Sequence, residues 1–417
     1  MPSGRGGGNS GLGKIVFQQR KATPRRRLLD LLQTHDTGDP RMSHTVRAAV
    51  LEAMGLPAPY AQSRPLQVRE VELDDPGPGE VRVRVLAAGL CHSDLSVVNG
   101  DRPRPLPMVI GHESAGEVLA CGEGVHDLAP GDRVIMVFVP SCGSCAPCQE
   151  ARPALCEPGA ASNGAGTLLG GARRLRLNGQ PLNHHVGVSC FAEQCVVSRR
   201  SCVKVDASLT PAEASLFGCA VLTGAGAVFN TARLPAGSTA AVIGLGGVGF
   251  SALLAAVASG AREVVAVDLS DEKLALAREL GATATVNARD ADAAERVRSL
   301  TRGGVDFAFE MAGAIPAMEL AWAITRRGGS TVSSGLPNPA KRFALPPVQM
   351  VAEERTLRGS YLGSGVPSRD LPRYIEMYRR GKLPVDRLMG RQFGLEDINL
   401  GLDRLATGEA MRDVVLL

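Results

Sequence analysis

The chain has 417 residues, of which 44% are hydrophobic and 21% charged, so it is long enough for two globular domains with complete cores. Its formal net charge of +4 is small for this length, which argues against a protein that binds polyanions with its whole surface. Ten cysteines in a long chain without a signal-peptide pattern favour metal ligands over a disulfide framework. We therefore expect a reducing, cytoplasmic setting.

The N-terminal segment, residues 1–44, differs in composition from the rest. Residues 1–29 contain several arginines and lysines and no acidic side chain, among glycines and serines. Such a basic arm could target an organelle or bind nucleic acid, or it could be a disordered extension ahead of a natural start at Met42. We favour the disordered extension, because the apolar pattern typical of a folded domain begins only at Thr45–Val50.

Two folding patterns follow one another along the rest of the chain. Up to Val139 the pattern is mostly β, with alternating runs such as Val81–Val85 between Pro- and Gly-rich turns, which predicts a partly open antiparallel barrel. Later, strands alternate with helices, the pattern of a parallel sheet covered on both faces. A helix at Leu371–Arg380 and a strand at Val414–Leu417 then return to the first domain. We therefore predict an α/β protein with a barrel domain (45–220 and 362–417) and a parallel-sheet domain (221–361).

The stretch from Ala240 to Asp268 carries a nucleotide-binding pattern. An apolar strand enters a glycine-rich turn, which is followed by an apolar helix and by a second strand that ends on Asp268. In such a unit the glycines allow a pyrophosphate to approach the free N–H groups of the helix N-terminus. A carboxylate at Asp268 binds the adenosine ribose and repels a 2′-phosphate, so we expect NAD rather than NADP. The turn residues are Gly244, Gly246, Gly247, Val248 and Gly249.

The same region has a second interpretation. Residues 239–261 carry no charge and are long enough to span a bilayer. The closely spaced glycines and the strand-like flank argue against a membrane helix. We expect this run to form the buried centre of a domain.

The cysteines predict a closed zinc site. Four of them lie close together in a turn-rich stretch, and this clustering argues against a chance group of free thiols. Four thiolates around a tetrahedral Zn²⁺ form a structural site with no open position. Three further candidates, Cys91, His112 and Cys219, are far apart, and their spacing alone does not join them. The four clustered cysteines are Cys142, Cys145, Cys148 and Cys156.

Five motifs in a fixed order resemble the zinc-dependent alcohol dehydrogenases of the medium-chain dehydrogenase/reductase superfamily. They are Gly89–Asp94, Gly111–Gly116, the four-cysteine segment, Gly218–Gly224 and the glycine turn. The resemblance covers residues 45–417. It implies a GroES-like catalytic domain, with a structural zinc lobe at residues 140–157, beside a Rossmann domain that binds NAD.

The resemblance also implies the role of each matching residue. Cys91, His112 and Cys219 hold a catalytic zinc with one open position, where the pKa of the bound alcohol falls and the alkoxide passes hydride to NAD⁺. Among the implied supporting residues, Glu113 lies behind the metal and can approach it during ligand exchange, Asp94 orients His112, and Ser93 accepts the proton of the substrate hydroxyl. Phe138 lines the substrate pocket. In the cofactor site, Thr223 contacts the nicotinamide, Lys273 the adenosine ribose, and Arg412 and His92 the pyrophosphate.

Two positions depart from the family pattern. Ser96 stands where some relatives have a histidine that ends the proton path, so we expect the proton to leave through water. His92 stands where many relatives have arginine, and an imidazole holds a pyrophosphate less firmly at neutral pH. We therefore expect weaker NADH binding than an arginine would give.

The resemblance implies a homodimer or homotetramer that acts on a primary or secondary alcohol, or on its aldehyde or ketone, with no nucleic-acid or membrane partner. The nearest alternative is a thiol adduct of formaldehyde; Arg102, Arg104 and Ala160 argue against the glutathione adduct. The two arginines either favour an anionic or bulky substrate or are solvated surface charges. A zinc-containing nucleic-acid-binding module is the alternative from another class, but it leaves the nucleotide-binding pattern without a use.

Overall fold

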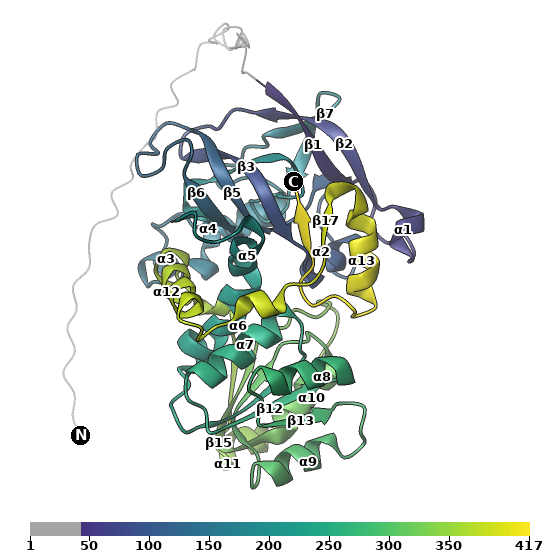
Figure 1. Cartoon of the computed structure of the whole chain (residues 1–417), viewed down its shortest axis with the longest axis vertical. Coiled ribbons are helices and arrows are strands. Elements are labelled where there is room, and N and C mark those ends of the chain that lie inside the picture. The colour runs from purple at the N-terminus through teal and green to yellow at the C-terminus, as the bar shows by residue number, and fades with distance from the viewer. Residues whose placement is uncertain (1–42) are drawn as a thin grey trace, which may run out of the picture. The chain divides into compact units, whose positions relative to one another are not determined.

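The computed structural model describes residues 43–417, which form three β-sheets and the helices around them (Figure 1). The expectation for the basic arm therefore falls almost entirely outside the described residues. The first strand begins at Ser43, close to the predicted start of the folded pattern. The predicted α/β class, with a small barrel-like domain and a parallel-sheet domain, is confirmed.

Five strands close into a small barrel, whereas we expected a partly open barrel. The path closes because the short strand β4 pairs antiparallel with β1 and parallel with β8. Its interior is apolar and includes Val46, Val50, Leu73 and Leu182. The barrel strands are, in order around the barrel, β1 (Ser43–Leu51), β2 (Leu66–Asp74), β7 (Leu175–Leu177), β8 (Gln180–His184) and β4 (Met108–Val109).

The second sheet has seven strands, and it brings the C-terminal end of the chain next to the segment that leads into Cys91. The C-terminal strand pairs antiparallel with β3, with Val414 opposite Gly89, so the last residues lie beside the motif that contains Cys91. The strands run in the order β10 (Cys202–Val205), β6 (Arg133–Val137), β5 (Glu113–Cys121), β3 (Glu80–Gly89), β18 (Val414–Leu416) and β17 (Gln392–Gly394), and β9 (Gln194–Ser198) also pairs with β3.

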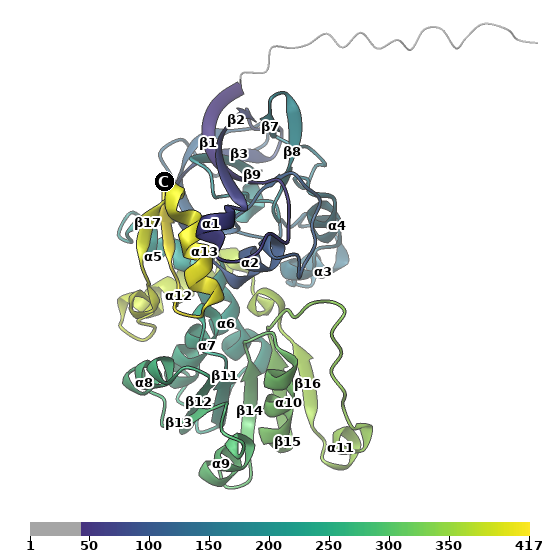
Figure 2. The ribbon, with the colours of Figure 1, turned by 90° about the vertical axis from the view of Figure 1, so that its right-hand side faces the viewer.

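The third sheet is the predicted parallel one. All its pairs are parallel, and β11 lies between β12 and β14 (Figure 2). Its strands are, in order, β13 (Ala284–Asn287), β12 (Glu263–Asp268), β11 (Thr239–Ile243), β14 (Val305–Glu310), β15 (Thr325–Ser333) and β16 (Thr356–Gly359).

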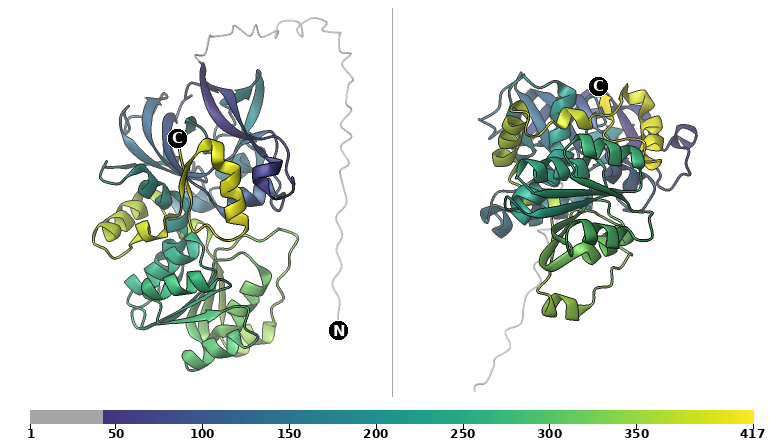
Figure 3. Two further views of the ribbon diagram at one scale, coloured as in Figure 1. Left: turned by 45° about the vertical axis from the view of Figure 1, so that its right-hand side comes forward. Right: turned by 60° about the horizontal axis from the view of Figure 1, so that its bottom comes forward.

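Helices cover both faces of this sheet (Figure 3). They are α7 (Gly247–Ala258) and α8 (Asp271–Glu279) on one face, and α9 (Ala293–Leu300) and α10 (Ile315–Ile324) on the other. Successive residues of a strand point to opposite faces. Accordingly, Ala240 and Val242 pack with residues of α7 and α8, whereas Ala241 and Ile243 pack with residues of α9 and α10.

A continuous helical run connects the seven-stranded sheet to the parallel sheet. It begins with the capping box visible in the sequence: Thr210 Oγ1 accepts from the N–H of Glu213, and the Glu213 carboxylate accepts from the N–H of Thr210. Within residues 43–417 this run, Pro211–Ala232, is the one that is long and apolar enough to cross a membrane, but 89% of its apolar 18-residue window is buried inside the protein. Its parts are α5 (Pro211–Leu216), the π-helical turn η3 (Phe217–Val221), α6 (Leu222–Gly226) and the π-helical turn η4 (Ala227–Ala232).

The remaining helices include one whose start differs from the prediction. Helix α12 (Pro367–Arg379) begins earlier than the predicted Leu371, because Pro367 suits a first helical turn and the Asp370 carboxylate accepts from the N–H of Val366 at 2.9 Å. The others are α1 (Tyr60–Ser63), α2 (His92–Val98), α3 (Ala146–Gln149), α4 (Glu157–Ala165), α11 (Pro347–Ala352), α13 (Ile398–Ala406) and the short 3₁₀ turns η1 (Pro153–Leu155), η2 (Arg199–Ser201), η5 (Tyr361–Ser364), η6 (Val385–Leu388) and η7 (Leu395–Asp397).

Candidate active site

Three residues that are far apart in the sequence meet at one buried point. The side-chain ligand atoms of Cys91, His112 and Cys219 lie within 4.8 Å of one another, and all three residues are buried. Each comes from a different element: Cys91 precedes α2, His112 precedes β5, and Cys219 lies in the π-helical turn η3. The structure therefore brings together the set that sequence spacing alone did not join.

A buried carboxylate sets the orientation of the His112 ring. Asp94 Oδ1 lies 2.8 Å from Nδ1 of His112, while Asp94 Oδ2 accepts from the N–H of Cys91 at 3.1 Å. The other ring nitrogen, Nε2, is buried and has no hydrogen-bond partner within residues 43–417. A buried nitrogen without a partner is costly unless something binds it, and a metal bound at Nε2 would use its lone pair.

The electrostatics of the cluster favour a metal-binding thiolate. A hydrogen bond with the Cys219 thiol and the positive charge of Arg412 hold the pKa of Cys91 well below its usual range, against the effect of burial. Thiolate and neutral imidazole are the donors that Zn²⁺ prefers, and three ligands leave one tetrahedral position free. These residues therefore fit a catalytic zinc.

A buried ion pair lies directly behind the cluster. Glu113 Oε1 accepts from Arg412 Nη1 at 2.7 Å, and Oε2 accepts from the N–H of Ala220 at 3.1 Å. Burial raises the pKa of Glu113 to about 7, with the charge of Arg412 acting in the opposite direction. The resemblance implies that Glu113 can approach the metal during ligand exchange; in this structure it is outside the group whose ligand atoms converge, because both of its oxygens are engaged elsewhere.

The four clustered cysteines also converge, as their spacing predicts. The sulfur atoms of Cys142, Cys145, Cys148 and Cys156 lie within 4.8 Å of one another. Backbone N–H groups point at two of them: Cys142 Sγ accepts from Ser144 at 3.4 Å, and Cys156 Sγ accepts from Gly159 at 3.3 Å. The N–H of Ser144 lowers the pKa of Cys142 to about 6. Four thiolate donors with backbone support fit a closed structural zinc.

Two residues near the site were not singled out from the sequence. The buried His185 has its ring centroid 5.6 Å from that of His112, and its Nδ1 is 3.5 Å from Asp94 Oδ1. Tyr361 lies 6.0 Å, centroid to centroid, from Phe138, and Phe138 lies 5.2 Å from His112. The consecutive histidines 184 and 185 were the one available sequence signal for His185, whereas nothing local distinguishes Tyr361.

The glycine turn has the geometry that a nucleotide-binding unit needs. Gly244 has a φ of +89°, a left-handed conformation that glycine adopts without strain. Asp268 lies at the end of β12, where its Oδ2 accepts from the N–H of Leu245 at 2.6 Å and its Oδ1 from the N–H of Ser270 at 2.9 Å. The acid predicted to contact the ribose thus lies directly against the turn.

We expect Gly249→Ala to disrupt this turn. A Cβ at Gly249 would overlap the carbonyl oxygen of Gly244, so the helix and the strand would have to separate, at a cost of about 1–3 kcal/mol of stability, and NADH affinity should fall with it. Gly246→Ala is the matched control for stability, because a Cβ at Gly246 meets nothing within 4 Å. Thermal unfolding and NADH fluorescence titration measure the two effects. Equal melting temperatures for the two variants would contradict this reading of the turn.

The other predicted cofactor residues are distributed around the turn. A Cβ on Gly247 would lie 2.6 Å from Nε of Arg412, so this arginine reaches the turn as well as Glu113. Thr223, in α6, is buried, and its hydroxyl has no hydrogen-bond partner among residues 43–417. His92 is exposed at the start of α2, and Lys273 is half-buried in the first turn of α8.

Comparison with known proteins agrees with this arrangement. Two families match the chain: the alcohol dehydrogenase GroES-like domain over residues 77–207, and the zinc-binding dehydrogenase domain over residues 247–380. A solved structure described as an alcohol dehydrogenase zinc-binding domain protein from Burkholderia ambifaria is 34% identical, with a TM-score of 0.85, over 90% of this chain and 100% of that one. The chain belongs to the zinc-binding alcohol dehydrogenase family of the medium-chain dehydrogenase/reductase superfamily.

Two further solved structures are similar to this zinc-binding dehydrogenase. Benzyl alcohol dehydrogenase from Acinetobacter calcoaceticus is 29% identical, with a TM-score of 0.83, over 90% of this chain and 99% of that one. A protein from Sinorhizobium meliloti described as a zinc-binding dehydrogenase, bound to NADP, is 27% identical, with a TM-score of 0.74, over 90% of this chain and 100% of that one. These similarities extend along nearly the whole described chain.

On the substrate side of this dehydrogenase, the two serines of α2 differ in their surroundings. Ser93 is half-buried, two residues after the predicted zinc ligand Cys91. Ser96 is buried, and its hydroxyl donates to the carbonyl of His92 at 2.8 Å. Because its proton is engaged within the helix, Ser96 is not placed to extend the proton path that is predicted to begin at Ser93.

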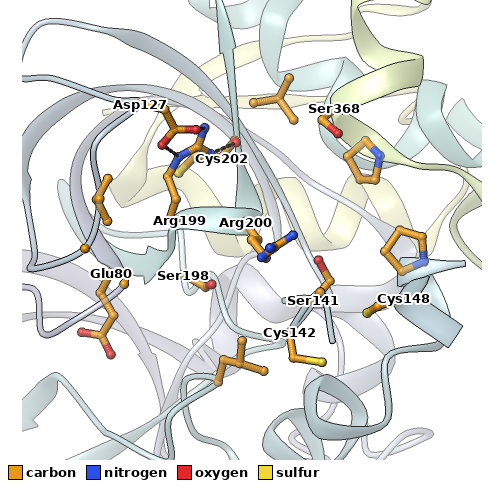
Figure 4. Close-up of a pocket in the computed structure, with 18 of the residues that line it drawn as sticks. Glu80, Asp127, Ser141, Cys142, Cys148, Ser198, Arg199, Arg200, Cys202 and Ser368 are labelled. Atoms are coloured by element: carbon orange, nitrogen blue, oxygen red, sulfur yellow. Dashed lines mark hydrogen bonds and ion pairs between the residues drawn. The ribbon is translucent and has the colours of Figure 1, made fainter. Parts of the chain in front are cut away.

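A cavity of about 1030 Å³ lies away from the predicted catalytic zinc (Figure 4). Its lining includes Cys142, Cys148 and Arg200, and neither Cys91, His112 nor Cys219 contributes to it. Figure 4 also shows the ion pair of Arg199 and Asp127 at its wall, with Nε and Oδ1 2.7 Å apart. This cavity therefore lies against the four-cysteine segment and its neighbours, not at the Cys91–His112–Cys219 cluster.

Proposed function

We propose that this protein is an NAD-dependent zinc alcohol dehydrogenase that interconverts a primary or secondary alcohol and its aldehyde or ketone. The observation that carries the proposal is the meeting of Cys91, His112 and Cys219 around a buried ring nitrogen without a partner. When bound there, zinc would act as a Lewis acid that makes the alcohol hydroxyl more acidic and polarises the carbonyl oxygen in the reverse direction.

The residues of the chain would divide the remaining work among themselves. Asp94 holds the proton of His112 at Nδ1, which keeps Nε2 available as a ligand. Ser93 would accept the proton of the substrate hydroxyl. Phe138, which lies edge-on to His112, and Tyr361 behind it would exclude water from one side of the reacting carbon. Thr223 would position the nicotinamide.

NAD rather than NADP is favoured by the acidic end of β12. The carboxylates of Asp268 and of the exposed Asp271 and Glu272 at the start of α8 support this choice, because a like charge close to a 2′-phosphate costs several kcal/mol. We therefore expect kcat/KM to be roughly 100-fold or more higher with NAD⁺ than with NADP⁺. Steady-state kinetics with both cofactors test this, and Asp268→Ser should narrow the ratio. Equal use of the two cofactors by the unaltered enzyme would refute the assignment.

The activity itself is tested with a panel of alcohols and aldehydes. We expect reduced cofactor to appear, by its absorbance, with simple primary or secondary alcohols. S-hydroxymethylglutathione is included as a competing substrate and should be the weaker one. If no alcohol in the panel supports turnover by protein that contains both zinc ions, the proposed reaction is wrong.

A further inference from the structure

Two arginines follow the helix that begins at the first zinc ligand. The backbone N–H of Arg102 donates to the carbonyl of Ser96 at 2.8 Å, which ties Arg102 to the second turn of α2. Since a helix rises about 1.5 Å per residue, this attachment point lies within roughly two turns of Cys91. Arg104 follows two residues later, and its Nη1 donates to the carbonyl oxygen of Asn163 in α4 at 3.2 Å.

The positive charges of both guanidinium groups act on Tyr361, whose ring lies next to that of Phe138. Burial raises the pKa of Tyr361, and the positive charges of Arg102 and Arg104 act in the opposite direction. Tyr361 contacts Phe138, which is in turn edge-on to His112. Both positive charges therefore lie within electrostatic reach of Tyr361, the outer of the two rings beside His112.

These two arginines have no anionic partner in the described protein. No carboxylate of residues 43–417 lies within 4.0 Å of either guanidinium, although both side chains are half-buried. The neighbouring Asp101 is instead hydrogen-bonded to Asn99 and Asn338. Burial and the nearby positive charge of Arg102 lower the pKa of Arg104.

The loop that carries them is built to hold its shape. The N–H of Asp101 donates to the side-chain oxygen of Asn99 at 2.9 Å, which forms a local turn. Arg104 stands between Pro103 and Pro105, and the proline rings restrict the backbone on both sides of it. A rigid loop loses little conformational entropy when its side chains bind a ligand.

We propose that the substrate of this enzyme carries a carboxylate, bound by Arg102 and Arg104 at the end of the molecule remote from the reacting carbon. The proposal rests on the proposed alcohol dehydrogenase function and names its substrate class. Guanidinium groups pair with carboxylates through two parallel hydrogen bonds, and a half-buried cation pair gains most from such a partner. The carboxylate takes no part in the hydride transfer, in which the alcohol and NAD⁺ give the aldehyde, NADH and a proton.

The test compares three substrates that share the same reacting group and ring. They are benzyl alcohol, para-(hydroxymethyl)benzoate and the methyl ester of the latter, which has its bulk without its charge. We expect kcat/KM for the carboxylate to exceed that for the other two by about 10- to 100-fold, and the advantage to shrink as salt is added. An omega-hydroxyhexanoate and hexanol pair repeats the comparison with a flexible chain.

Variants assign the effect to the arginines. Arg102→Gln and Arg104→Gln should each lower the ratio of kcat/KM for the carboxylate to that for benzyl alcohol by about 10-fold. Arg69→Gln is the matched control; it removes the same charge from the exposed face of β2, where Arg69 lies 3.7 Å from Glu52. That ratio should not change in the control.

Three results would overturn the proposal. One is equal kcat/KM for the carboxylate and benzyl alcohol. The second is a kcat/KM for the methyl ester equal to that for the carboxylate, which would mean that the site selects for bulk. The third is a ratio of kcat/KM for the carboxylate to that for benzyl alcohol that stays unchanged in both glutamine variants. If no alcohol is turned over, the proposed reaction fails first, and calorimetry with para-carboxybenzaldehyde against benzaldehyde then decides the matter. Tighter binding of the anion that is lost in Arg102→Gln supports the charge site, and equal binding of the two aldehydes refutes it.

Discussion

Replacement of Cys91 by serine is expected to abolish turnover while the protein stays folded. A serine hydroxyl is not a zinc ligand of the kind that holds such sites, so the ion beside His112 and Cys219 should be lost. The Lewis acid supplies several kcal/mol of transition-state stabilisation, which corresponds to a fall in kcat/KM of at least about 10³-fold. Zinc analysis by atomic emission should show that half of the metal is lost, and the melting temperature should change little.

The control variants separate this effect from general loss of cysteine. Cys121→Ser alters a half-buried cysteine outside both clusters, whose thiol donates to the carbonyl of Leu128 at 3.5 Å. It should retain all zinc and its activity. Cys142→Ser should lose the other ion and lower the melting temperature, because that site is structural. If Cys91→Ser retained its full zinc content, the three-ligand site would not exist as described.

Among the substitutions described, replacement of Arg412 by methionine is expected to cause the largest loss of folding stability. Glu113 is fully buried, and Arg412 is its only cationic partner among residues 43–417, so the variant leaves a buried carboxylate without its counter-charge. Breaking a buried pair in this way costs about 3–5 kcal/mol. Chemical denaturation should show the loss, and NADH titration should show weaker binding, since Arg412 also lies against the glycine turn.

A double variant tests the cause of that loss. Arg412→Met combined with Glu113→Gln removes both charges, so part of the stability should return relative to Arg412→Met alone. Arg69→Met is the control for an exposed arginine, and it should cost less than about 1 kcal/mol. A double variant no more stable than the single one would show that the charge of Glu113 is not the source of the loss.

Residues that are close together in the chain were predictable from their spacing. The four clustered cysteines converge because their separations are too short, and their stretch too rich in turns, for them to lie far apart. The strand, glycine turn, helix and strand from β11 to Asp268 appear where the pattern placed them, since Gly244 and Gly249 serve contacts made within the motif itself. In both cases the interactions are local, so the local sequence determines them.

The catalytic trio depended on the tertiary structure or on family resemblance. Cys91, His112 and Cys219 meet only because the seven-stranded sheet and the helical run Pro211–Ala232 pack together, and no spacing rule encodes a packing of that kind. The same holds for His185 and Tyr361, whose proximity to Asp94 and Phe138 is a product of long-range contacts. Here the sequence supplied candidates, and the fold selected among them.

Arg102 and Arg104 show most clearly the difference between what the sequence determines and what the fold determines. From the sequence, Arg102 and Arg104 could equally have been solvated surface charges. Whether a guanidinium is a surface charge or a binding group depends on its burial, its neighbours and its lack of a counter-ion, which are properties of three-dimensional packing. The sequence by itself thus determined the family, the nucleotide-binding turn and the four-cysteine site, whereas only the tertiary structure decided which dispersed ligand atoms meet and which charges stay without a partner among residues 43–417.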